Sequence, residues 1–131
     1  SDLGFILLKF AVEHVTEKSL DQYCQEEFYR KLGMHHTDFL AHKRLNKNNL
    51  VPSCVDKLYR KTELKGYVHD PVAALLGGIA GHAGLFSTAE DLAKMMQLYL
   101  NGGTYGGEYY FSPETMVTTF WLPTPLVIGM L

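Results

Sequence analysis

The sequence predicts a mainly α-helical domain, because apolar residues recur at helical spacing and the helices have recognisable starts. The spacing runs through residues 3–15, 20–32 and 89–100, and each run follows a serine, threonine or aspartate that can cap a helix. Two shorter helices are expected after Asp70 and Ser112, each of which is followed by a proline suited to the first helical position.

Length and composition describe one globular domain of ordinary polarity. The chain has 131 residues, 47% of them hydrophobic and 20% charged, so it is long enough to bury a core. Its net charge of −2 and its lack of a basic cluster argue against nucleic acid as a partner. The apolar run at 3–15 is shorter than the roughly 20 residues of a membrane span, so none is predicted. Cys24 and Cys54 lack zinc or redox spacing, and their disulfide state stays open.

A long irregular segment is expected after the first two helices. Apolar residues occupy nearly every face of the first helix, which predicts that it is buried, with elements beyond this fragment on one side. The second helix is expected to start at Ser19 and to end at Gly33. Over 34–67 the periodicity fails, which predicts a long irregular surface loop. The adjacent residues His35 and His36 cannot share a helical face as metal-binding histidines do, so no metal is expected there.

Residues 77–87 read Gly-Gly-Ile-Ala-Gly-His-Ala-Gly-Leu-Phe-Ser and form the most distinctive stretch. Four glycines within eight residues allow sharp turns and a close approach to another backbone or to a ligand. A capping-box pattern from Ser87 to Glu90 then opens a helix, which places His82 on a tight loop just before a helix N-terminus. The spacing matches neither the P-loop nor the dinucleotide-binding motif, so nucleotide binding is disfavoured and packing is favoured over ligand binding.

The C-terminal quarter of the sequence and its first residues show three further patterns. Gly106 and Gly107 predict a turn, with a short hairpin around it. The atypical tail over 117–131 is apolar and broken by prolines, so it should need a surface to cover it. The chain opens directly in a helical pattern at Ser1, which suggests a piece of a longer protein.

Five segments occur here in a recognisable order and spacing. They are Ser-Asp-Leu-Gly-Phe-Ile-Leu-Leu at 1–8, Lys-Leu-Gly-Met at 31–34 followed by Thr37, Gly-Leu-Phe-Ser-Thr-Ala-Glu-Asp-Leu-Ala at 84–93, Leu-Asn-Gly-Gly at 100–103 and Ser-Pro-Glu-Thr at 112–115. Together they resemble the serine β-lactamase and penicillin-binding family, specifically its class C-like and esterase-like members. Gly-Tyr-Val-His-Asp-Pro at 66–71, taken with 81–87, more closely resembles β-lactamase-like modules fused to family 3 glycosidase-like domains in Bacteroidetes.

The resemblance implies the helical lobe of the β-lactamase/transpeptidase-like α+β fold, with the central sheet largely missing. The family's chemistry uses a serine nucleophile with a lysine three residues on, and none of the five serines here has one. Ser1 and Asp2 match the tail of the family's second, tyrosine-containing motif, with Asp2 at the position usually held by asparagine. Asp2 is thereby a candidate catalytic residue, and His82 and Gly84 are candidate substrate-binding residues.

The same resemblance implies a serine hydrolase that transfers an acyl group from an amide or ester. A small-molecule or peptidoglycan-like substrate, no cofactor and a periplasmic or exported location go with it. The chain is then a fragment that is inactive alone and packs against the remaining lobe of its parent protein. His82-Ala83-Gly84 spells the family's third motif but precedes a helix instead of following a strand. The resemblance implies that the true third motif comes later, beyond the end of this chain.

Two other hypotheses stay open. A non-catalytic helical binding or scaffolding domain fits the capped helices and the glycine-rich loop equally well, with His69, Asp70 and His82 in structural roles. Those three residues are also of types that bind zinc, which makes a metal site the third hypothesis. Asp70 is most simply a helix cap, and His82 either lines the substrate cleft or hydrogen-bonds backbone carbonyls to hold its loop.

Overall fold

Helices dominate the computed structural model, which describes residues 1–121 of the chain and side chains as far as residue 119. The helical elements are α1 (Asp2–Thr16), α2 (Leu20–Cys24), η1 (Gln25–Tyr29), α3 (Ala41–Arg44), η2 (Lys47–Asn49), α4 (Pro71–Leu75), α5 (Ala89–Leu100), α6 (Pro113–Met116) and η3 (Val117–Trp121). The strands are β1 (Pro52–Asp56), β2 (Thr62–Lys65), β3 (Thr104–Tyr105) and β4 (Glu108–Tyr109). The predicted mainly α fold is confirmed.

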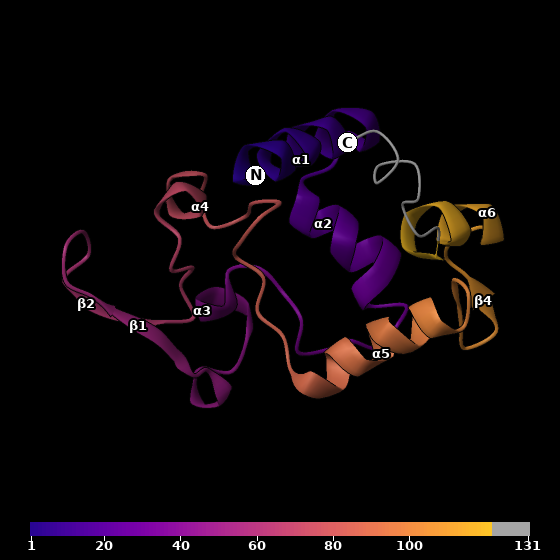
Figure 1. Ribbon diagram of the computed structural model, residues 1–131. Coiled ribbons are helices and arrows are strands. Elements are labelled where there is room, and N and C mark those ends of the chain that lie inside the picture. Colours follow the sequence, from indigo (N-terminus) through magenta and orange to yellow (C-terminus); the bar gives the residue numbers. More distant parts are fainter. Residues whose placement is uncertain (122–131) are drawn as a thin grey trace.

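The elements form a stack of helices with a hairpin projecting from one side. Helix α1 lies over α2, and α2 leads down to α5, while the β1–β2 hairpin points away from the stack (Figure 1). Both sheets among the described residues are two-stranded and antiparallel, β1 with β2 and β3 with β4. A large central sheet is therefore missing from the described residues, as the helical-lobe prediction requires.

Helix starts follow the caps that the sequence indicates. The side chains of Asp70, Thr88 and Ser112 each accept the backbone N–H three residues on, at 2.7, 3.2 and 3.1 Å. Ser19 holds the N-cap position of α2 without a side-chain bond. The α5 cap is Thr88, one residue after the Ser87 at which the predicted capping box begins. These bonds satisfy backbone donors that have no partner within a helix.

The core lies where the second helical segment meets α5. Tyr29, Leu32, Met34 and Leu98 form its buried cluster. The residues after β4 cover it, and the ring of Phe111 stacks on an aromatic ring of η1 at 5.6 Å between centroids. The helical elements of this segment end at Tyr29, earlier than predicted, and the turn that follows contains the predicted glycine, Gly33, with a φ of 68°.

The described residues do not bury the first helix, for which the sequence predicts burial with elements beyond this fragment on one side. None of the residues of α1 is buried, and the side chains of Leu3, Leu7 and Val15 are 63, 61 and 80% exposed. Helix α1 packs on α2 and meets the glycine-rich loop at Gly81, and these contacts leave much of its apolar surface exposed among the described residues. No helix of the described part is long and apolar enough to cross a membrane.

The segment 34–67 is more regular than predicted. It contains α3, η2 and the β1–β2 hairpin, in which Cys54 pairs with Leu64 and Asp56 with Thr62. The strands are short and mostly exposed on both faces, so they lack the alternation of apolar and polar residues that indicates a strand. The short β3–β4 hairpin around Gly106 is confirmed. Of the predicted atypical tail, residues 117–121 form η3, and residues 122–131 lie outside the described part.

Candidate functional site

The glycine-rich loop that follows α4 packs against the first turns of α1. A Cβ atom at Gly81 would collide with the carbonyl oxygen of Phe5, so only glycine permits this approach. Gly84 has a φ of 109°, and a Cβ there would collide with the carbonyl oxygen of Gly78 within the loop itself. Both glycines thus serve close backbone packing, as the sequence favours, and this packing joins the loop to α1.

His82 of this loop pairs with the aspartate that caps α4. Its Nε2 donates to Oδ1 of Asp70 at 3.0 Å, and the same carboxylate oxygen accepts the N–H of Ala73 at 2.7 Å. The His82 side chain is 6% exposed and that of Asp70 is 33% exposed. The Ala73 N–H and then His82 hold the pKa of Asp70 below its ordinary value. The prediction that Asp70 caps a helix is confirmed, while His82 bonds a carboxylate instead of backbone carbonyls.

A hollow of about 480 Å³ is lined by residues of the glycine-rich loop, α1 and α2. Its walls are mainly apolar, and His82 and Gly84 both line it. The Nδ1 atom of His82 is buried here and has no hydrogen-bond partner among the described residues. The hydrogen bond to Asp70 therefore orients the His82 ring so that Nε2 faces the carboxylate. The other ring nitrogen, Nδ1, is left in the mainly apolar surroundings of the loop.

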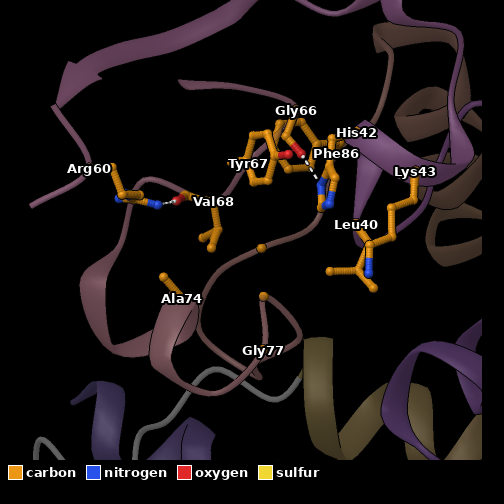
Figure 2. Close-up of a pocket in the computed structure, with 12 residues that line it drawn as sticks. Leu40, His42, Lys43, Arg60, Gly66, Tyr67, Val68, Ala74, Gly77 and Phe86 are labelled. Carbon is orange, nitrogen blue, oxygen red and sulfur yellow. Dashed lines mark hydrogen bonds between the residues drawn. The ribbon is translucent and has the colours of Figure 1, made fainter. Parts of the chain in front are cut away.

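A second hollow, of about 310 Å³, lies on the other side of the loop, toward the β1–β2 hairpin. Figure 2 shows the ring of His42 stacked on that of Tyr67, with 3.9 Å between centroids, and Nδ1 of His42 beside the Gly66 carbonyl at 3.1 Å. Arg60 reaches in from the hairpin and donates to the carbonyl oxygen of Val68 at 2.7 Å. Gly84 lines this hollow as well, so the glycine-rich loop forms a wall between two cavities.

Asp2 stands exposed in the first turn of α1. Phe5, whose carbonyl meets the loop at Gly81, lies about one turn further along the same helix. The glycine-rich loop, which carries the candidate residues His82 and Gly84, therefore meets α1 about one turn after the candidate residue Asp2. The contact between the loop and α1, at Gly81 and Phe5, is backbone to backbone. Among the described residues, no side-chain bond joins Asp2 to the loop.

The third member of the predicted metal group lies elsewhere. Nδ1 of His69 is 2.9 Å from Sγ of Cys54, whereas the carboxylate of Asp70 is hydrogen-bonded to His82. In the described part of the chain, no three His, Cys, Asp or Glu side chains are close enough to hold a metal ion. The hypothesis of a metal site formed by His69, Asp70 and His82 is therefore wrong, because two neighbours along the chain take different partners.

A buried aspartate that the sequence does not single out, Asp91, lies in the first turn of α5 and joins this helix to residues 36 and 37. The Asp91 carboxylate is 1% exposed and accepts from the His36 N–H at 2.8 Å, the Thr37 hydroxyl at 3.0 Å and Lys94 Nζ at 3.1 Å. Burial raises the pKa of Asp91, but these three donors outweigh it and hold the pKa below its ordinary value. The only feature of the sequence that points to Asp91 is its position in the first turn of a capped helix. Many solvent-exposed acidic residues occupy the same position, so it does not identify a buried one.

Comparison with known proteins decides the family. The family model described as Beta-lactamase matches residues 1–114, which is most of the chain. This chain belongs to the beta-lactamase family. The match includes α1 with Asp2, the α4 cap and the whole glycine-rich loop, so the candidate residues all lie inside it.

Relatives within this beta-lactamase family include two bacterial proteins named "Putative D-alanyl-D-alanine carboxypeptidase". The protein of Escherichia coli K12 is 41% identical and that of Salmonella schwarzengrund 37%, each alignment covering 88% of this chain and 30% of the relative. An octameric penicillin-binding protein homologue from Pyrococcus abyssi has the same fold over 95% of this chain and 26% of its own, with a TM-score of 0.62 at 22% identity. The chain thus spans less than a third of the length of these proteins.

Proposed function

We propose that this chain is the helical part of a serine hydrolase that transfers an acyl group from an amide or ester, and that it is inactive alone. The observation that carries the proposal is the family match over residues 1–114 in a chain without any serine followed by lysine three residues on. The nucleophile must then come from another part of a longer protein, since the family's chemistry depends on that serine and lysine.

The proposed role of Asp2 is to contribute to the substrate cleft in place of the usual asparagine. An ionised aspartate only accepts hydrogen bonds, whereas asparagine both donates and accepts, so the substrate would have to offer a donor at this point. His82 and Gly84 are proposed to form the wall beside it, with His82 held by Asp70. The backbone contact between Gly81 and Phe5 supports this arrangement, because it brings the loop that carries His82 and Gly84 to the N-terminal half of the helix that carries Asp2.

The proposed substrate is a peptidoglycan-like peptide ending in D-alanyl-D-alanine, on the ground of the name that the two bacterial relatives carry. Such a substrate lies outside the cytoplasm, so the parent protein is proposed to be periplasmic or exported. The alternative of a non-catalytic binding domain remains the competing proposal.

Labelling with a fluorescent penicillin tests the proposal. The 131-residue chain should not be labelled, whereas a longer product of the same gene that includes a serine–lysine motif should be acylated and should release D-alanine from a peptide ending in D-Ala-D-Ala. In that longer protein Asp2→Ala should slow acylation, by roughly a hundredfold if Asp2 contacts the reacting group. Glu114→Ala is the matched control, since Glu114 is also an exposed acid in the first turn of a helix.

Two results would contradict the proposal. Turnover by the 131-residue chain itself would mean that the nucleophile lies within it. A longer protein that is neither acylated nor able to release D-alanine would favour the non-catalytic binding domain instead.

A further inference from the structure

A cysteine and a histidine meet on the hairpin side of the molecule, and neither is among the candidate catalytic or substrate-binding residues. Sγ of Cys54, in β1, is 2.9 Å from Nδ1 of His69, which follows β2. Cys54 is partly exposed and His69 exposed, so small molecules can reach both. A nucleophile within hydrogen-bond reach of a base is the arrangement that activates thiols.

The histidine is held in place by a third group. The guanidinium of Arg60 donates to the carbonyl oxygens of Val68 at 2.7 Å and of His69 at 2.9 Å. Its Nε donates to the carboxylate of Asp56 at 2.8 Å, and that carboxylate is 10% exposed. The hairpin turn therefore holds the backbone that carries His69, whose ring lies beside the thiol of Cys54.

The chain's other thiol lies in a different environment. Cys24 packs against the core cluster beside Tyr29, and burial raises the pKa of its thiol. Both cysteines are free thiols. Two thiols in one chain, one with a base beside it and the other against the core, provide an internal comparison.

We propose that Cys54 and His69 form a reactive thiol site that exchanges with small-molecule disulfides. His69 takes the thiol proton at Nδ1, and the Cys54 thiolate attacks one sulfur of the disulfide. The bond between the two sulfurs of the small molecule breaks as the new bond to Cys54 Sγ forms. The leaving thiolate then takes the proton back from His69, so the products are a mixed disulfide at Cys54 and one free small thiol.

The rate of modification by 4,4′-dithiodipyridine, resolved by peptide mass spectrometry, tests this proposal in the intact protein. Cys54 should react about tenfold faster than Cys24 at neutral pH, because only its thiol has a base to take the proton. His69→Ala should slow the reaction of Cys54 by about the same factor, and added imidazole should restore part of it. His35→Ala, which removes an exposed histidine that touches no thiol, should change neither rate.

The proposal fails if Cys54 and Cys24 react within about twofold of each other, or if His69→Ala leaves the rate at Cys54 unchanged. Imidazole rescue separates loss of the base from a change in the hairpin, because a distorted hairpin would not be repaired by a small base. The outcome is independent of the proposed hydrolase, since none of these measurements requires acyl transfer.

Discussion

Replacing Asp70 by alanine removes two hydrogen bonds that meet at one carboxylate oxygen. Loss of a helix cap costs about 1 kcal/mol of unfolding free energy. The same change leaves Nε2 of His82 without its acceptor, in a side chain that is 6% exposed. An unsatisfied buried donor costs about 1–3 kcal/mol, and the lower part of that range applies because water can reach the 33% exposed Asp70 position. Asp70→Ala should therefore lower the free energy of unfolding by about 2–3 kcal/mol in total.

Urea denaturation followed by far-UV circular dichroism measures this loss, and Thr88→Ala supplies the control. Thr88 caps α5 through the same kind of bond but has no histidine attached to it, so its loss should cost about 1 kcal/mol. The difference between the two variants, about 1–2 kcal/mol, is then the contribution of the His82 pair. Asp70→Asn keeps an acceptor oxygen at the cap and should cost less than Asp70→Ala.

A double-mutant cycle of Asp70→Ala with His82→Ala completes the experiment. If the two side chains act as a pair, the double variant should lose about 1 kcal/mol less unfolding free energy than the sum of the losses in the two single variants. The reasoning is refuted if Asp70→Ala and Thr88→Ala cost the same within about 0.5 kcal/mol and the cycle closes additively.

Two further predictions concern acid stability and loop packing. The hydrogen bond from Arg60 lowers the pKa of Asp56 from 3.8 to about 2, so the stability that this carboxylate contributes is fully present above pH 3.8 and is lost as the pH falls toward 2. An acid titration of unfolding free energy should show a shallower decline in Asp56→Asn, and an unchanged slope would contradict the assignment. Gly81→Ala should lower the melting temperature through its collision with the Phe5 carbonyl, at a cost of about 1–3 kcal/mol. Gly4→Ala, where a Cβ meets nothing within 4 Å, should instead raise stability slightly, and equal effects of both changes would count against the close contact.

Local signals in the sequence account for most of the helix boundaries. The caps at Asp70 and Ser112 were predictable because each uses a side-chain oxygen and an N–H only three residues apart. The turn at Gly33 was predictable for a similar reason, since glycine adopts the positive φ found there more readily than other residues do. Interactions within one helical turn leave their pattern in the sequence directly.

Partners far apart in the chain were not predictable in the same way. Nothing in the spacing of Cys54 and His69, or of His36 and Asp91, indicates that they meet, because the hairpin and the loop bring them together. The exposure of α1 has a related cause. Hydrophobicity shows that a helix prefers to be covered, but not which part of a protein covers it.

The weak attachment of α1 has a consequence for motion. A helix with no buried residue is held by few contacts and belongs to the part of a fold that opens most readily. Its amides should therefore exchange with solvent deuterium sooner than those around Leu98 in α5, which is fully buried. Asp2 moves with α1, so any surface that covers the apolar side of this helix would also fix the position of a candidate catalytic residue. Assembly and chemistry would then depend on the same helix.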